Sequence, residues 1–191
     1  MRYFIGLLIA IGLIVLVFVL IFKNVGGKTS VPKPLVDYAY TDTVMRFTTE
    51  GPVTADQDYQ SMQISVSQSD TQFIVYQGYQ GTISFQEDFA SNPIAYANFL
   101  RALDINGYTK GNTGPSVQTD ERGYCALGER YIYEVVNDNG QDAQRFWSTS
   151  CGGEGTYKGS VANVIALFEN QIPNFAQVEG KLNFNLSSSG L

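Results

Sequence analysis

Residues 130–150, RYIYEVVNDNGQDAQRFWSTS, carry the clearest local signal for the fold of this chain. Its two halves, 130–136 and 144–150, are rich in the β-branched and aromatic residues that favour strands. Between them stands NDNG, residues 137–140, and an Asn-Gly pair is the strongest short-range signal for a tight turn between antiparallel strands. The stretch therefore predicts a β-hairpin.

A helix is expected on each side of this hairpin. On the C-terminal side Ser160 is a favourable N-cap and Pro173 stops the helix. The apolar residues between them share one helical face: Val161, Val164, Ile165, Phe168 and Ile172. On the N-terminal side Asn92-Pro93 opens a helix and Asn106-Gly107 closes it. Its apolar stripe consists of Tyr96, Phe99, Leu100 and Leu103.

Strands are also expected before the first helix. Met62, Ile64 and Val66 alternate with polar residues, which is typical of a half-buried strand. Turn residues then separate two further strands, 71–77 and 82–86. The segment 37–52 is expected to add an edge strand, which runs through Val44, Arg46 and Thr48.

The order of strands, helix, strands and helix predicts one α+β domain over residues 37–185. In this interpretation two strand-strand-helix units share a mostly antiparallel sheet, and both helices lie on one face of it. The tail, residues 186–191, is expected to fray.

The N-terminal segment is expected to anchor the chain in a membrane. Tyr3–Phe22 is an uncharged apolar run of twenty residues, which as a helix spans roughly the 30 Å of bilayer hydrocarbon. A cleaved signal peptide is the rival interpretation, but it needs a shorter apolar core and a cleavage site of small residues. The sequence therefore predicts a transmembrane anchor at 1–23 that contacts the lipid bilayer, followed by an extended tether at 24–36.

The two cysteines, Cys125 and Cys151, flank the hairpin. An antiparallel return of the chain would bring them together, and a disulfide that closes a loop of about 26 residues stabilises by roughly 3–4 kcal/mol. A reactive thiol is the alternative. Because disulfides persist outside the cytoplasm, the pairing favours a cytoplasmic N-terminus and an extracytoplasmic body.

Charge and composition exclude several classes of protein. The chain carries 12 basic and 18 acidic side chains, and all four charges among the first 34 residues are basic, so the body has a net charge of −10. An acidic body argues against nucleic acid as a partner. The chain contains no histidine, which excludes Ser-His-Asp and Cys-His catalysis and the HExxH zinc site.

No cofactor or metal ion is expected. Residues 151–156, CGGEGT, look like a phosphate-binding loop, but the Lys-Ser/Thr pair that should open the next helix is missing. The acidic turns 56–58 and 138–142 lack the closing glutamate of a calcium loop.

The tyrosines are candidates for a binding surface, because tyrosine gives a large contact area at low entropic cost. Alternation puts Tyr131 and Tyr133 on one strand face and Ile132 on the other. We expect the two tyrosines to point outward, with Tyr79 and Tyr157 nearby in turns. The alternative, that they are ordinary buried strand residues, stays open.

Five segments carry a resemblance to a known group of proteins: 51–56 (GPVTAD), 76–79 (YQGY), 120–125 (DERGYC), 147–152 (WSTSCG) and 171–175 (QIPNF). Over about residues 44–176 the chain resembles single-pass surface proteins of small-genome candidate-phyla bacteria, which have no characterised activity. The resemblance implies a location in the cell envelope and transfers no catalytic residue.

The expected function is therefore a membrane-anchored extracytoplasmic module for binding or adhesion, whose partner is another envelope protein or a host-surface protein. The alternatives are a cell-envelope hydrolase and a structural subunit of a surface assembly. A deep pocket with convergent carboxylates would favour the hydrolase, whereas an aromatic binding face would favour the module.

Overall fold

The computed structural model describes residues 33–180 and 182. The expected transmembrane anchor, most of the tether and the expected frayed tail lie outside these residues. Within the described part, no helix is both long and apolar enough to cross a membrane. The described residues from Pro34 onward belong to one compact unit.

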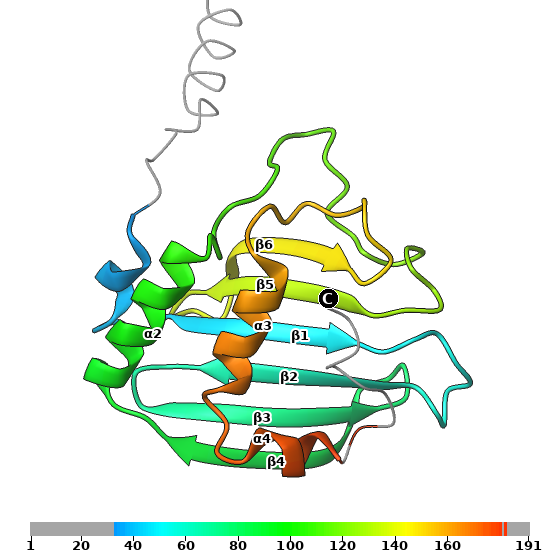
Figure 1. Cartoon of the computed structure of the whole chain (residues 1–191), viewed down its shortest axis with the longest axis horizontal. Helices are drawn as coiled ribbons and strands as arrows, with labels where there is room; N and C mark the ends of the chain where they lie inside the picture. The colour runs from blue at the N-terminus through cyan, green and yellow to red at the C-terminus, as the bar shows by residue number, and fades with distance from the viewer. Residues whose placement is uncertain (1–32, 181, 183–191) are drawn as a thin grey trace, which may run out of the picture. The chain divides into compact units, whose positions relative to one another are not determined.

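The described residues contain one antiparallel sheet of six strands in the order β4-β3-β2-β1-β5-β6 (Figure 1). The strands are β1 (Val44–Glu50), β2 (Gln60–Val66), β3 (Asp70–Gln77), β4 (Thr82–Ala90), β5 (Arg130–Val136) and β6 (Asp142–Thr149). The hairpin expected from residues 130–150 is confirmed as β5 and β6, which pair in antiparallel register.

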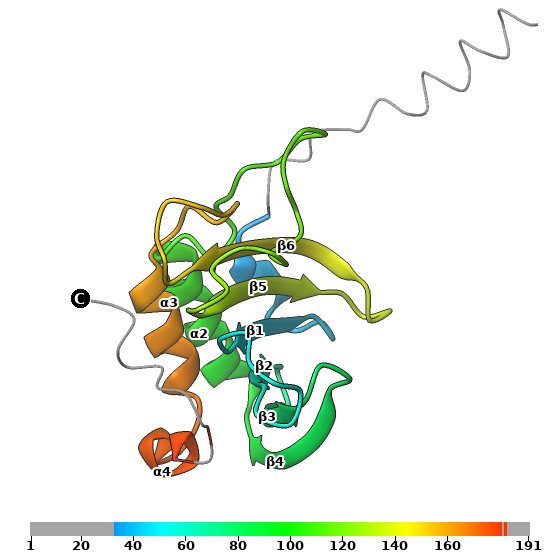
Figure 2. The ribbon, with the colours of Figure 1, turned by 90° about the vertical axis from the view of Figure 1, so that its right-hand side faces the viewer.

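The helices cover one face of this sheet (Figure 2). They are the 3-10 helix η1 (Leu35–Tyr38), α2 (Pro93–Ile105), α3 (Val161–Glu169) and α4 (Phe175–Glu179). The Asn92 side chain accepts hydrogen bonds from the backbone N–H groups of Ile94 and Ala95, which explains why α2 begins where the sequence predicts.

The α+β class is confirmed, but the arrangement of strands differs from the expectation. Four strands precede α2 and only two lie between α2 and α3, so the two units are unequal. The prediction of an edge strand through Val44, Arg46 and Thr48 is wrong, because β1 lies between β2 and β5. Its pairing decides its place, since Phe47 pairs with Ile64 of β2 on one side and with Tyr133 of β5 on the other. Met45 and Phe47 are fully buried beneath the helices.

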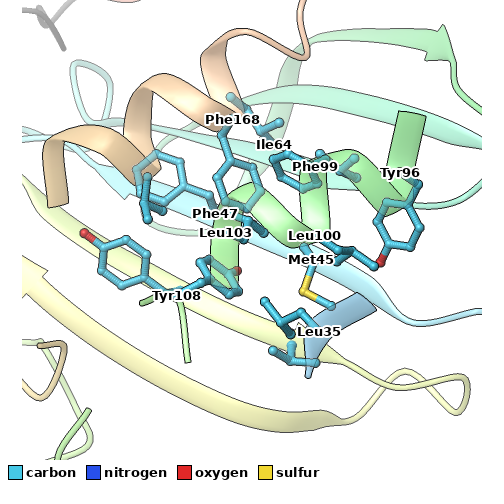
Figure 3. Close-up of a cluster of buried hydrophobic side chains, with 14 of the residues drawn as sticks. Leu35, Met45, Phe47, Ile64, Tyr96, Phe99, Leu100, Leu103, Tyr108 and Phe168 are labelled. Carbon is cyan, nitrogen blue, oxygen red and sulfur yellow. The ribbon is translucent and has the colours of Figure 1, made fainter. Parts of the chain in front are cut away.

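An aromatic cluster holds the helices on the sheet (Figure 3). The ring of Phe168 on α3 lies 5.4 Å from Phe47 on β1, 5.1 Å from Phe99 on α2 and 5.6 Å from Tyr108, measured between centroids. The Phe99 and Phe168 rings meet nearly at right angles, a favourable edge-to-face arrangement. One side chain of α3 thus joins the sheet, α2 and the loop that follows α2.

Candidate functional site

The long segment between α2 and β5 crosses the sheet face that the helices leave uncovered. Trp147 on β6 pairs with Ile132, which points away from the helix layer. The Trp147 indole Nε1 donates a hydrogen bond of 2.9 Å to the carbonyl oxygen of Gln118. Arg145, also on β6, donates to the carbonyl oxygen of Thr119 at 2.6 Å. These bonds fix residues 118–119 over the end strands of the sheet.

A second segment, 155–157, lies along the outer edge of β6. The backbone N–H groups of Thr156 and Tyr157 both donate to the Trp147 carbonyl oxygen at 2.9 Å, and Trp147 N–H donates to Thr156 Oγ1 at 3.0 Å. Gly155 makes this approach feasible, because a Cβ there would lie 2.5 Å from the Trp147 carbonyl oxygen. Its φ of +125° is also a conformation that favours glycine.

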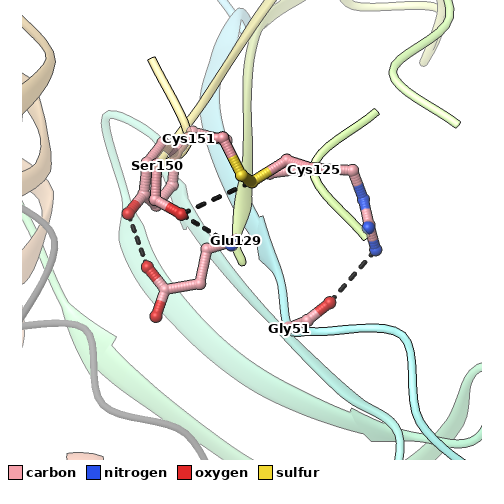
Figure 4. The surroundings of a disulfide bond; sticks show 7 residues. Gly51, Cys125, Glu129, Ser150 and Cys151 are labelled. Carbon is pink, nitrogen blue, oxygen red and sulfur yellow. Dashed lines mark hydrogen bonds between the residues drawn. A yellow bond between two sulfur atoms is a disulfide. The ribbon is translucent and has the colours of Figure 1, made fainter. Parts of the chain in front are cut away.

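The Cys125–Cys151 disulfide joins these two segments (Figure 4). Cys125 lies near the end of the loop that crosses the sheet face, and Cys151 lies near the start of the loop that returns along the edge of β6. Ser150 strengthens the junction, because its hydroxyl accepts from Glu129 N–H at 2.9 Å while its own N–H donates to the Glu129 carbonyl oxygen at 3.0 Å. The predicted pairing of the cysteines is confirmed.

A pocket of about 380 Å³ lies between the two segments that the disulfide ties together. It is lined by Asn112, Ser116, Val117, Gln118, Tyr124, Trp147, Glu154, Gly155 and Thr156. Tyr124 and Trp147 form the aromatic part of the lining, with ring centroids 4.9 Å apart and planes tilted by 41°. Trp147 is buried and Tyr124 is half-buried, so Tyr124 is the more accessible ring.

Four exposed polar side chains surround these rings: Asn112, Ser116, Gln118 and Glu154. Within residues 33–180 and 182, none of the four makes a side-chain hydrogen bond or an ion pair with another protein group. Their backbones are nevertheless fixed at two points, since Asn112 N–H donates to the Thr156 carbonyl oxygen and Gln118 accepts from Trp147. The pocket therefore offers unused donors and acceptors on a constrained backbone.

Charged groups beside the pocket hold its walls in place. Arg145 bridges Glu121 at 2.6 Å and Glu134 at 3.1 Å, which ties the crossing loop to β5 and β6. Burial raises the pKa of Glu134, and Asp142 raises it further, against the opposing effect of the nearby arginines. These carboxylates are committed to ion pairs within the fold.

The crossing loop contains one more ion pair, on its exposed side. Arg122 binds Asp120 through three side-chain hydrogen bonds of 2.6–3.0 Å, and these bonds, together with the Arg122 backbone N–H, lower the pKa of Asp120 to about 2. Asp120 is not part of the pocket lining, in which Glu154 is the one acidic side chain.

The predicted tyrosine surface is wrong for three of its four members. Tyr131, Tyr133 and Tyr157 are 0%, 1% and 5% exposed, and all three belong to the core beneath the helices. The physical reason is that β5 is covered on both faces, by helices on one and by the crossing loop on the other, so Ile132 is buried too. Alternation on a doubly covered strand cannot show which face is outward.

Two of these three buried tyrosines have a hydroxyl partner inside the domain, whereas the buried Tyr157 hydroxyl has none among the described residues. Tyr131 donates to Glu129 Oε2 at 2.5 Å, and the Tyr133 hydroxyl lies 2.9 Å from Ser148 Oγ. Tyr133 and Tyr157 also stack, with centroids 3.9 Å apart. Large rings with satisfied hydroxyls can replace aliphatic residues in a core.

Tyr79 is exposed, as expected, but it lies in the turn between β3 and β4 and is absent from the pocket lining. It stacks on Tyr59 at 4.1 Å and donates to the Thr54 carbonyl oxygen at 2.8 Å. The four predicted tyrosines therefore do not form one surface.

Sequence reasoning missed the pocket because its walls come from loops without periodicity. One signal was present: the glycine-rich run 152–155 directly follows the strand that carries the chain's one tryptophan. Among the described residues, no group of three or more Cys, Asp or Glu side chains is arranged to hold a metal ion.

Comparison with known proteins does not assign the pocket. No protein-family model matches the chain, and no curated protein shows significant similarity to it.

Proposed function

We propose that this chain is a membrane-anchored, extracytoplasmic binding module whose ligand binds in the pocket between segments 112–124 and 154–156. The observation that carries the proposal is the set of four unpartnered polar side chains around the Tyr124 and Trp147 rings. Small-molecule sites combine an aromatic lining with a few polar groups that fix orientation, and their volumes run from about 300 to 1,000 Å³.

The anchor and the compartment rest on the sequence and on the disulfide. The apolar run Tyr3–Phe22 has the length of a membrane-spanning helix, and a disulfide between Cys125 and Cys151 persists best in an oxidising compartment. The resemblance to single-pass surface proteins agrees with this location. The body would then present its pocket outside the cytoplasm.

Binding is better supported than hydrolysis. Most glycosidases place two carboxyl groups about 5–9.5 Å apart on either side of the scissile bond. The pocket lining provides one carboxylate, Glu154, while neighbouring Glu121 and Glu134 are committed to Arg145. The geometry therefore favours a module that holds its ligand without changing it.

A ligand screen tests the binding role. The purified chain would be heated with a panel of neutral and charged saccharides, short peptides, nucleosides and lipids, since a bound ligand raises the midpoint of unfolding. At least one compound should raise the midpoint of the wild-type chain and not that of the Asn112→Ala/Gln118→Ala variant. Gln80→Ala/Gln141→Ala removes two exposed amides outside the pocket and serves as the control.

If every stabilising compound acts equally on the pocket variant, the pocket is not the binding site and the proposal is wrong. The compartment is tested separately by fusing a reporter after Leu191. An alkaline phosphatase fusion should be active and a cytoplasmic reporter inactive, whereas the opposite pattern would reverse the proposed orientation.

A further inference from the structure

We infer that the pocket binds a neutral carbohydrate ring, an inference that rests on the proposed function and adds the chemical class of the ligand. The aromatic rings, the hydrogen-bonding groups and the charges of the lining each support this ligand class.

The aromatic rings suit one face of a sugar. A pyranose ring carries C–H groups on its faces, and these hydrogens bear a small positive charge, whereas the face of an aromatic ring is partly negative. Tyr124 is half-buried against Trp147, so one ring face is supported from behind and held in position. A rigid aromatic platform of this kind costs little conformational entropy on binding.

The polar side chains match hydroxyl groups. The amides of Asn112 and Gln118 each donate and accept, the hydroxyl of Ser116 does both, and the carboxylate of Glu154 only accepts. A sugar hydroxyl is itself both donor and acceptor, so it can pair with any of these four side chains. A lipid chain or another apolar ligand would instead strip water from these groups and leave them unpaired, which costs about 1–3 kcal/mol for each buried group.

The charges of the lining disfavour an anionic ligand. The lining contains no lysine or arginine, and its one ionic group, Glu154, repels phosphate, sulfate and uronate. Beyond residue 34 the chain carries 8 basic and 18 acidic side chains, which adds a negative field around the pocket. A cationic ligand has only Glu154 to bind, without a second acid in the lining. A neutral, hydroxyl-rich ring fits all three observations.

Trp147 provides a direct readout, because it is the one tryptophan in the chain and it lines the pocket. The full chain would be kept in a detergent without a sugar headgroup, since alkyl glycosides would compete for the site. Neutral oligosaccharides, uronic-acid oligosaccharides and amino-sugar oligosaccharides would then be titrated while tryptophan emission is recorded. The expected result is a saturable change in emission with a neutral oligosaccharide.

Three variants make the result specific. Asn112→Ala/Gln118→Ala should weaken binding at least tenfold, and Gln80→Ala/Gln141→Ala should leave it unchanged. Glu154→Gln keeps a hydrogen-bonding group and removes the charge, so it should weaken a neutral ligand less than threefold. A cationic amino sugar would instead lose at least tenfold from the same change, because its ion pair is lost.

The outcomes separate this inference from the proposed function. The ligand class is wrong and the binding module stands if only uronic-acid or amino-sugar oligosaccharides bind. The same conclusion follows if no saccharide binds while another compound of the thermal screen depends on Asn112 and Gln118. If saccharides bind equally to wild type and to Asn112→Ala/Gln118→Ala, both proposals fail. If neutral saccharides bind and only the pocket variants weaken them, the inference is supported.

Discussion

The hydroxyl of Tyr108 lies inside the sheet, between β1 and β5. It is 2.6 Å from the carbonyl oxygen of Arg46 and 2.9 Å from that of Glu134, and it accepts from Glu134 N–H at 3.1 Å. A side chain from the loop after α2 thus completes the hydrogen bonding between two strands. The ring is 1% exposed and packs against Phe168.

Tyr108→Phe should therefore lower the free energy of unfolding by about 1–3 kcal/mol, because buried backbone groups of β1 and β5 lose their partner while the ring is kept. Urea unfolding measures the change. Tyr40→Phe is the matched control, since Tyr40 is 76% exposed and the same substitution there should stay within about 0.5 kcal/mol of wild type. Equal effects of the two substitutions would refute the bridging role of the hydroxyl.

Two glycines of the loop between β6 and α3, Gly153 and Gly155, allow an equally close comparison. Gly155→Ala should destabilise the domain by about 2–4 kcal/mol, because the added Cβ would meet the Trp147 carbonyl oxygen at 2.5 Å as well as adopt an unfavourable φ. Gly153→Ala adopts a positive φ of 79° in open space and should cost about 1 kcal/mol. Thermal unfolding of both variants checks the difference, and a Gly153→Ala that is the more damaging change would contradict it.

At the scale of elements, β4 is an exposed edge. β4 ends the sheet, and no other strand of the described chain pairs with its outer side. Glu87 and Asp88 are exposed in its middle, and Asp88 is held by hydrogen bonds from Gln72 and Gln86. Charges on an edge strand discourage pairing with a second molecule, because they would be brought together and lose water.

Removing these charges should promote self-association. The variant Glu87→Thr/Asp88→Thr keeps the strand and is expected to sediment as dimers or larger species at concentrations where wild type is monodisperse. Asp37→Thr/Asp138→Thr makes the same change in net charge at exposed positions away from the sheet edge. If that control associates equally, net charge and not the edge is responsible.

Elements with local signals could be predicted from the sequence, and elements fixed by distant contacts could not. The ends of α2 follow from Asn92 and Asn106, and the hairpin of β5 and β6 follows from its Asn-Gly turn. The central place of β1 depends on its pairing with β5, far along the chain. The short helix α4 was missed because it is fixed by packing, with the Phe175 ring 6.2 Å from Phe73.

The candidate site shows the same limit. The disulfide could be predicted because the hairpin between the cysteines sets their spacing. The pocket itself could not be predicted, since loops 112–124 and 154–156 lie on opposite sides of the β5–β6 hairpin in the sequence and meet only in the folded domain. Tyr131 was misplaced for a related reason: the cover on the second face of β5 comes from a loop.

At the scale of the whole molecule, buried tyrosines make stability depend on alkaline pH. Burial raises the pKa of five tyrosines above the usual value of 10.0: Tyr59, Tyr96, Tyr108, Tyr133 and Tyr157. These hydroxyls keep their protons in the folded state, whereas in the unfolded chain they ionise near pH 10. Their stabilising effect is therefore complete below pH 10 and is lost as the pH rises above it.

The expected result is a fall in the free energy of unfolding above pH 10, by about 1.4 kcal/mol per pH unit for each fully buried tyrosine. Urea titrations on either side of pH 10 measure the slope. The tyrosinate absorbance of these rings should appear together with the loss of circular dichroism. Ionisation of all the tyrosines while the protein is still folded would contradict the prediction.

The central position of β1 also determines when the sheet can be completed. During synthesis the meander β1–β4 can close by short loops, but the second neighbour of β1 begins only at Arg130, which lies 80 residues from its ion-pair partner Glu50. Until β5 pairs with β1, the middle of the future sheet is an open edge. The entropic cost of closing a long loop delays this pairing. In pulsed hydrogen exchange, amides in the hydrogen bonds between β1 and β2 should gain protection before amides in the hydrogen bonds between β1 and β5. The reverse order would show that the sheet assembles from β5 and β6 inward.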